Sequence, residues 1–180
     1  DQGFAWGQHG FKSKVAPYRA TVEAPLIIRL PGQQAEPSAG RVITAPVSGV
    51  DLPPTFFAQA GIEPPWKMHG HDLSPLLGKQ PKQWQHPAML VHTGRQYGSA
   101  TNTIPDNDDP ALYHGPGVPW YVMLSEGKYK YIRNLVSGET EELYQMQKDP
   151  EELTNLAQSP QHRELLLQFR QSMIRELKRT

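Results

Sequence analysis

The sequence contains no cysteine in its 180 residues. Disulfide scaffolds, thiolate metal sites and cysteine nucleophiles are therefore excluded for this chain, while the redox compartment stays open. No stretch approaches 18 uncharged apolar residues, so the sequence predicts no membrane span. Charge of one sign is also lacking, because 18 basic residues balance 18 acidic ones. A neutral chain offers no electrostatic basis for binding nucleic acid or an anionic membrane surface.

Proline and glycine are frequent instead, at 18 and 15 residues. This composition is typical of long ordered loops between short elements. No internal repeat occurs. The length suffices for one domain, or for a large part and a small one, with a buried core.

The first half of the chain contains one predicted strand and one predicted helix. Residues 21–32 hold a short apolar run that stops at a Pro-Gly step, which predicts a buried strand. Residues 47–62 predict a helix, with Asp51 near its start and Gly61 at its end. One strand and one helix do not complete a sheet. We therefore expect this half to be the end of a larger α/β domain, so that the chain is a fragment.

The second half predicts strands followed by a helix, an α+β pattern. Residues 88–95 and 141–146 predict single strands, and residues 120–135 predict a hairpin. Residues 159–180 predict a helix capped by Ser159. Its predicted apolar stripe consists of Leu166, Phe169, Met173 and Leu177.

The opening residues, DQGFAWGQHGFKSK, contain candidate ligands for ions. Asp1 and Gln2 supply a carboxylate and an amide oxygen, which calcium and magnesium favour. Two oxygens cannot complete a calcium shell of about six to eight, so a polar turn is the alternative. Lys14 carries a compact charge suited to sulfate or phosphate oxygens, and its alternative is a solvated loop lysine.

Segments along the sequence, beginning with these residues, resemble the motifs of the sulfatase family in the alkaline-phosphatase superfamily and occur in the same order. That family has an Asp-Asn/His/Gln-Gly step, a Gly-Glu-His-Gly-like step, a lysine and a Pro-Leu-Ile-x-Arg-x-Pro-Gly strand exit. The matching segments here are DQG, GQHG, Lys14 and PLIIRLPG. Further matches, in the same order, are VSGVDLPPT, GHDLSPLLGK, EGKYKYIRN and EELYQMQKDPEELTNLA. Each piece alone is weak, but their order over nearly the whole chain makes the resemblance specific.

The resemblance implies an α/β fold in two parts. Residues 1–87 would be the C-terminal part of the large sulfatase catalytic domain, an α/β sandwich. Residues 88–180 would be a small C-terminal α+β subdomain, an antiparallel sheet with a C-terminal helix.

The resemblance also implies roles for the opening residues. Asp1 matches the family's metal-ligating aspartate, and Gln2 matches the adjacent ligand position, where its amide oxygen keeps ligand capacity. Lys14 matches the lysine that contacts the sulfate and the leaving-group oxygen. The expected cofactor is a divalent cation, calcium by preference. Gln8 replaces a usual glutamate, which weakens any charge-based role at that position.

The family nucleophile is a formylglycine matured from Cys or Ser in a C/S-x-P-x-R motif, and this chain has no such motif. We therefore expect formylglycine in a missing upstream N-terminal segment, and we expect this chain to be inactive alone. The implied substrate is a sulfated small molecule or glycan. Members are commonly exported, so the resemblance implies a periplasmic or secreted location.

In the family, the C-terminal subdomain would line the substrate entrance. His92, Arg95 and His114 lie on or beside its predicted loops and, with Trp120, are candidate contacts to a sugar or another alcohol. The alternative is structural, with His92 in a strand, Arg95 as a surface charge and Trp120 in the core.

Two other functions stay open. One is a phosphodiester or phosphonate ester hydrolase of the same superfamily, which shares this half of the site. The other is a non-catalytic, truncated module that binds anions or sugars. An exposed hydrophobic edge on the first half would favour a fragment of an enzyme, and a sealed core would favour the module.

Overall fold

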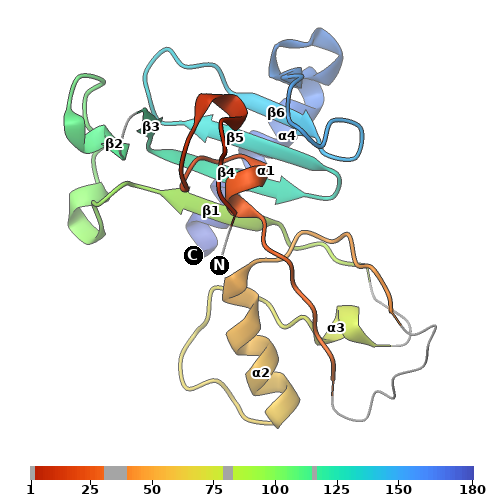
Figure 1. Ribbon diagram of the computed structural model, residues 1–180. Coiled ribbons are helices and arrows are strands. Elements are labelled where there is room, and N and C mark those ends of the chain that lie inside the picture. Colours follow the sequence, from red (N-terminus) through yellow and green to blue (C-terminus); the bar gives the residue numbers. More distant parts are fainter. Residues whose placement is uncertain (1–2, 31–39, 79–82, 115–116) are drawn as a thin grey trace.

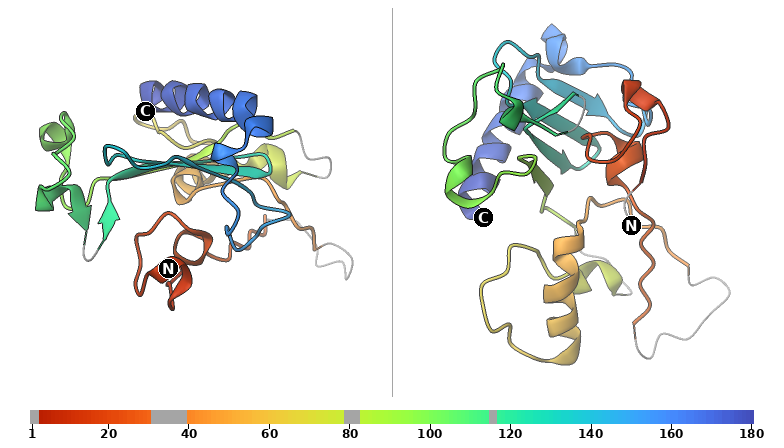
Figure 2. Two further views of the ribbon diagram at one scale, coloured as in Figure 1. Left: turned by 90° about the horizontal axis from the view of Figure 1, so that it is seen from above. Right: turned by 60° about the vertical axis from the view of Figure 1, so that its left-hand side comes forward.

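A computed structural model describes residues 3–30, 40–78, 83–114 and 117–180. Its centre is an antiparallel sheet of four strands in the order β1-β4-β5-β6. Helix α4 crosses one face of the sheet, and the N-terminal segment with helix α1 covers the other (Figures 1 and 2). The bounds are α1 Arg19–Val22, β1 Ala88–His92, β4 Tyr121–Glu126, β5 Tyr129–Asn134, β6 Glu142–Gln145 and α4 Arg163–Arg179.

The remaining elements are short. Strands β2 (Tyr113–His114) and β3 (Val118–Pro119) pair beside the sheet, while α2 (Leu52–Ala60) and α3 (Ser74–Leu77) lie below it in Figure 1. Single 3₁₀ turns occur at Gln8–Gly10, Gly49–Asp51, Gly98–Thr101, Pro110–Leu112, Leu156–Gln158 and Pro160–His162.

The sheet is buried on both faces at its centre. Four successive residues of β4, Tyr121 to Leu124, are buried, although neighbours in a strand point to opposite faces. Tyr121 and Met123 pack in the cluster that contains Ala16 of the N-terminal segment. Leu124 packs in the cluster that contains Leu166 of α4. The N-terminal segment is therefore a structural layer of the sheet.

The apolar stripe predicted for α4 is confirmed in part. Leu166 and Phe169 are buried against the sheet, whereas Leu177 is 40% exposed and lies outside the packed stripe. The predicted cap at Ser159 is wrong. The carbonyl of Ser159 accepts from the amide of His162 and closes a separate 3₁₀ turn, so α4 begins only at Arg163 and Ser159 makes no side-chain cap.

The predicted helix in residues 47–62 is confirmed as α2. Ser48 and Asp51 form a capping box at the preceding 3₁₀ turn. Gly61 ends α2 with a left-handed φ of 66°. Local turn chemistry alone was therefore enough to place this helix.

The strand predicted within residues 21–32 is wrong for the described part of it. Residues 24–30 have no assigned strand structure, and Ile27 is 94% exposed. A strand requires a hydrogen-bonding neighbour, and the sheets formed by the described residues do not include this segment. Residues 31 and 32 lie outside the described residues.

The predicted fold class is confirmed, because an antiparallel sheet and a C-terminal helix form in the second half. The division at residues 87 and 88 stays a prediction. Within the described ranges, no helix is both long and apolar enough to cross a membrane.

A buried carboxylate joins α4 to the sheet. Glu141 is 8% exposed and accepts hydrogen bonds from Tyr131 Oη at 2.5 Å and Arg170 Nε at 2.9 Å, and it pairs with Arg133 at 2.9 Å. Burial alone would raise the pKa of Glu141. The hydrogen bonds from Arg170 and Tyr131, with the two positive charges, outweigh it and lower the pKa from its ordinary value of 4.5.

This depressed pKa predicts a loss of stability in acid. As the pH falls, Glu141 becomes protonated in the unfolded chain before it does so in the folded protein, because its pKa is lower in the folded protein. The contribution of Glu141 to folding stability is therefore present above about pH 4.5 and is lost as the pH falls through the pKa of the folded state. Glu141→Gln should therefore flatten the decline of Tm between about pH 5 and about pH 3. Thermal unfolding followed by circular dichroism measures this. Exposed Glu164→Gln on α4 is the control and should follow the unmodified protein. Parallel curves for Glu141→Gln would contradict the role given to Glu141.

Candidate functional site

The predicted site residues of the opening segment are only partly described. Asp1 and Gln2 lie outside the described residues. Lys14 is half-buried on the loop between the Gln8–Gly10 turn and α1. This loop is part of the N-terminal segment that lies on the sheet opposite α4 (Figure 2). Elsewhere, no three His, Asp or Glu side chains of the described residues group as a metal site.

Backbone contacts close this loop on itself. The amide of Ala5 donates to Ser13 O at 2.9 Å, and the amide of Gly7 donates to Phe11 O at 2.8 Å. At Gly3, a Cβ would lie 1.9 Å from the carbonyl oxygen of Ala20 in α1. Glycine is required there by this close approach, which packs the start of the loop on α1.

The residue after Lys14 has a strained backbone. Val15 has a φ of 72°, in the left-handed region that β-branched residues rarely adopt. Tyr121 Oη of β4 donates a 2.7 Å hydrogen bond to Val15 O, and the next residue, Ala16, is fully buried. Strain held in place by surrounding contacts is a feature of functional sites. It marks Lys14 as a side chain on a fixed backbone.

The same Tyr121 contacts a second predicted site residue, His92, which in turn contacts a third, His114. It pairs with His92 across β4 and β1, and their rings stack with centroids 5.2 Å apart. His114 of β2 meets His92 edge to face at 5.6 Å. The structure therefore brings His92 and His114 together and connects them, through Tyr121, to the loop of Lys14.

The surroundings of His92 favour its neutral form. Burial, and then the charge of His114, lower the pKa of His92 from 6.5. Its Nε2 is buried and has no hydrogen-bond partner among the described residues. A neutral imidazole can donate or accept at that atom, so Nε2 is a hydrogen-bonding group that the described residues leave unsatisfied.

Arg95 and Trp120 are not part of the ring contact between the two histidines. Arg95 is exposed in the turn after β1. The preceding Gly94 approaches Trp120, and a Cβ there would lie 3.6 Å from Trp120 Nε1. Trp120 is 1% exposed and donates from Nε1 to Ala111 O at 2.9 Å. The structural interpretation of Trp120 is confirmed.

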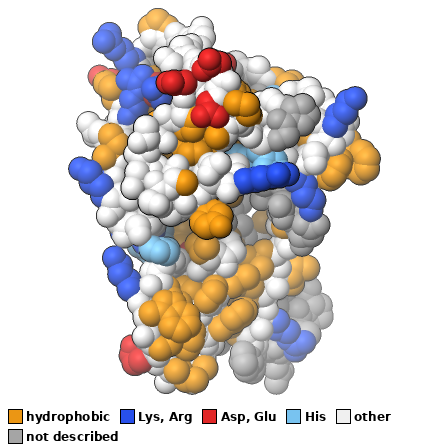
Figure 3. Space-filling model, turned by 90° about the vertical axis from the view of Figure 1, so that its left-hand side faces the viewer, with side chains coloured by type: hydrophobic (Ala, Val, Ile, Leu, Met, Phe, Trp, Pro, Cys, Tyr) orange, Lys and Arg blue, Asp and Glu red, His pale blue; other side chains and the backbone are white. Residues whose placement is uncertain are grey.

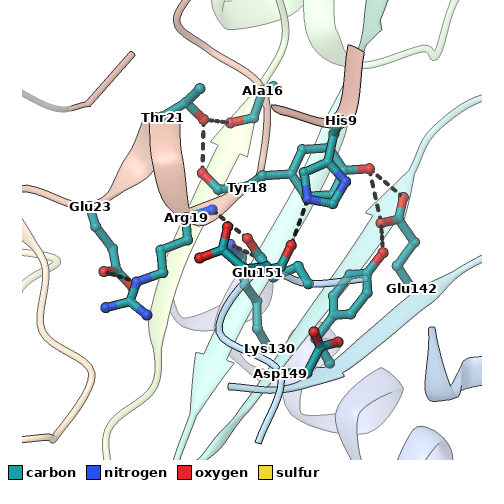
Figure 4. A network of polar contacts seen from close by, with 12 residues as sticks. His9, Ala16, Tyr18, Arg19, Thr21, Glu23, Lys130, Glu142, Asp149 and Glu151 are labelled. Carbon is teal, nitrogen blue, oxygen red and sulfur yellow. Dashed lines mark hydrogen bonds and ion pairs between the residues drawn. The ribbon is translucent and has the colours of Figure 1, made fainter. Parts of the chain in front are cut away.

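Sequence reasoning missed a polar network beneath the loop (Figure 4). The carboxylate of Glu142 accepts from Tyr18 Oη at 3.1 Å, Tyr144 Oη at 2.7 Å and Asn134 Nδ2 at 3.2 Å. The ring of His9 stacks on Tyr18 at 3.8 Å. Burial and Glu142 raise the pKa of both tyrosines, so their hydroxyls stay protonated and donate.

A second carboxylate, Glu152, was also missed. It pairs with Lys130 Nζ at 2.5 Å and accepts from the backbone amide of Arg19 at 2.6 Å. A pocket of about 280 Å³ lies beside it, lined by the loop, α1 and residues 150–152. Lys130 and Glu152 stand in the motifs EGKYKYIRN and DPEELTNLA, so a signal existed, but nothing local in the sequence pairs them.

Comparison with known proteins identifies relatives of this chain. The family model described as "N-sulphoglucosamine sulphohydrolase, C-terminal" matches residues 7–97. The Delta 4,5-hexuronate-2-O-sulfatase of Bacteroides thetaiotaomicron is 31% identical over 173 residues, which are 94% of this chain and 32% of that protein. The chain thus spans about a third of the length of the curated relatives it matches.

Solved structures show a similar fold. A candidate sulfatase of Bacteroides thetaiotaomicron aligns with a TM-score of 0.73 at 24% identity, over 99% of this chain and 34% of that one. The phosphonate monoester hydrolase of Silicibacter pomeroyi aligns with a TM-score of 0.64 at 27% identity, over 90% of this chain and 30% of that one.

The contact between the two histidines predicts a linked titration. His92 should titrate below 6.5, and His114→Ala should raise the pKa of His92, because the change removes a neighbouring charge and admits water. Histidine NMR titration measures both values. His69→Ala, an exposed histidine outside this pair, should leave His92 unchanged. A His92 pKa that is insensitive to His114→Ala would show that the two rings do not interact in solution.

Proposed function

This chain belongs to the sulfatase family, and from that premise we propose that it is the C-terminal portion of a metal-dependent sulfatase that hydrolyses a sulfate ester of a carbohydrate. The observation that carries the proposal is the position of Lys14. It lies on a strained loop that Tyr121 fixes beside His92 and His114. The family match over residues 7–97 covers this loop.

Lys14 would neutralise charge on the sulfate group. The sulfuryl oxygens and the departing ester oxygen carry negative charge during cleavage, and a fixed ammonium stabilises it without reorganising at the moment of reaction. The loop suits this role because its backbone is closed by hydrogen bonds on both sides of Lys14. A flexible lysine would lose part of that benefit in reordering.

Asp1 and Gln2 would hold the divalent cation, with calcium as the preferred ion. Their carboxylate and amide oxygens fit a hard cation, and the ligands still needed would come from an upstream segment. When bound, the cation would supply positive charge to a sulfate oxygen and a template for orienting it.

The exposed apolar surface of the first half supports an upstream segment. Figure 3 shows hydrophobic side chains gathered over the lower part of the molecule, where α2 lies in Figure 1. Ile27 is 94% exposed and Val42 88%, and such surface usually marks an interface. The upstream segment would cover it, pair with residues 24–30 and carry the formylglycine nucleophile. The exposed large hydrophobic residues of the first half are Phe4, Trp6, Leu26, Ile27, Val42, Ile43, Val50, Phe56, Ile62 and Trp66.

The substrate we propose is a sulfated sugar. A relative at 31% identity is named for a hexuronate sulfate, which supports a carbohydrate. His92 and His114 would contact sugar hydroxyls. Because His92 Nε2 is buried in this structure, its contact would require the surrounding side chains to open. Arg95, exposed in the following turn, would contact an anionic group of a longer substrate. A periplasmic or secreted location remains the prediction that the resemblance implies.

A phosphonate or phosphodiester hydrolase is the second candidate, because one such enzyme aligns at 27% identity with a TM-score of 0.64. A non-catalytic module is disfavoured by the exposed apolar surface, which a self-sufficient module would seal.

The experiment that tests the proposal assays a protein in which this chain is joined to its upstream segment. Sulfate esters of sugars should be cleaved in preference to phosphonate esters. Lys14→Ala should lower kcat by about a hundredfold or more, with a much smaller effect on Tm, because it removes charge stabilisation from a loop side chain. Exposed Lys12→Ala is the matched control and should retain activity. Near-normal turnover for Lys14→Ala would remove it from the mechanism, and preference for phosphonates would favour the second candidate.

The metal assignment has its own test. Asp1→Asn should lower the content of bound divalent cation after dialysis, because it removes the charged oxygen ligand. Elemental analysis by mass spectrometry measures the content. Asp106→Asn, in an exposed acidic loop, should retain it. Unchanged metal content in Asp1→Asn would refute the ligand role.

A further inference from the structure

Motifs from three parts of the chain meet at one buried carboxylate. Glu152 comes from DPEELTNLA, Lys130 comes from EGKYKYIRN, and Arg19 is the first residue of α1. Glu152 is 2% exposed and Lys130 3% exposed, so the ion pair is shielded from water. No role for Glu152 or Lys130 follows from the site described above.

Each oxygen of Glu152 has a different partner. Oε1 lies 2.5 Å from Lys130 Nζ of β5, and Oε2 accepts from the amide of Arg19 at 2.6 Å. An amide in the first turn of a helix has no intrahelical acceptor, so Glu152 satisfies it from outside the helix. The carboxylate thereby ties the start of α1 to the centre of the sheet. Its two partners, Arg19 and Lys130, are labelled in Figure 4.

The turn that carries Glu152 is itself fixed. Glu152 has a φ of 58°, which is uncommon outside glycine. Asp149 accepts from the amides of Leu153 and Thr154 on one side of it. Asn155 accepts from the amide of Leu143 in β6 on the other. Surroundings that hold a non-glycine residue in this conformation are rigid enough to position its side chain.

The backbone of residues 15–19 is held by a hydrogen bond at each end, and Lys14 immediately precedes it. Tyr121 holds the carbonyl of Val15, and Glu152 holds the amide of Arg19. We propose that Glu152 is a positioning residue, which fixes the far end of this backbone and thereby sets the place of Lys14 over the sheet. This inference rests on the proposed function of Lys14.

The charge of Glu152 has a second effect that the experiment must separate from positioning. Burial lowers the pKa of Lys130, and the charge and hydrogen bond of Glu152 oppose that shift. Removing the charge would leave Lys130 buried without a partner and would endanger folding. Glu152→Asp keeps the charge but shortens the side chain by about 1.5 Å, so the carboxylate can no longer reach both partners.

The test is a double-mutant cycle on kcat in the protein that contains the upstream segment. Glu152→Asp should lower kcat by about tenfold to a hundredfold while KM changes less than about threefold, because displacing a catalytic group by about 1 Å has effects of this size. In a Lys14→Ala background, Glu152→Asp should cause no further loss of kcat. Fully additive losses would overturn the proposal, since they would show that Glu152 does not act through Lys14.

Glu141→Asp is the matched control. Glu141 is also a buried carboxylate paired with cations, but its partner Arg170 is on α4, on the opposite face of the sheet. This variant should lower Tm without lowering kcat of the folded protein. Equal losses of kcat in the two variants would mean that any damage to the sheet impairs turnover, and would overturn the specific role of Glu152.

A second measurement does not depend on activity. Amide hydrogen exchange over residues 14–22 should be faster in Glu152→Asp and unchanged in Glu141→Asp. Unchanged exchange in Glu152→Asp would overturn the positioning role. If the unmodified protein releases no sulfate from any ester, the proposed function fails, and hydrogen exchange still decides whether Glu152 holds the backbone that follows Lys14.

Discussion

The burial of both faces of one four-stranded sheet determines where everything else lies. Strand β4 is buried at four successive positions, so each face needs its own cover. Helix α4 covers one face with Leu166 and Phe169. The N-terminal segment covers the other, where Ala16 joins a mostly apolar cluster and Glu142 and Glu152 bind polar groups of the segment. The loop of Lys14 is thus both a structural layer and the candidate site.

Both covers combine apolar packing with directional hydrogen bonds. Under α4 these bonds join Glu141 to Arg170 and Tyr131. On the other face, the hydrogen bonds of Tyr121, Glu142 and Glu152 fix individual backbone and side-chain atoms of the N-terminal segment. A group that must meet a sulfate oxygen within a few tenths of an ångström requires directional support of this kind.

Local pattern was enough to predict the β4–β5 hairpin, helix α2 and the packed half of α4, because turn residues and periodicity act over short distances. It failed for the strand predicted within residues 21–32, because the apolar run is present but the sheets of the described residues do not include residues 24–30. It also failed for Tyr121 and Glu152. In the sequence, Tyr121 has the character of an ordinary strand residue and Glu152 that of a solvated acid. Only the folded sheet brings Tyr121 to Val15 and Glu152 to Arg19. The sequence identified His92 and His114 as candidates, but it did not predict that their rings meet, because His114 belongs to a separate two-stranded sheet.

The contacts that hold the N-terminal segment have a consequence for folding order. Strands β4, β5 and β6 pair with their neighbours in sequence, so their sheet closes through short loops. The bonds of Tyr121 to Val15 and of Glu152 to Arg19 close loops of 106 and 133 residues. The entropy of closing such loops is recovered only once a finished surface exists to receive the segment. We therefore expect the sheet with α4 to form first, and the candidate site to be assembled last, when the beginning of the chain docks onto it.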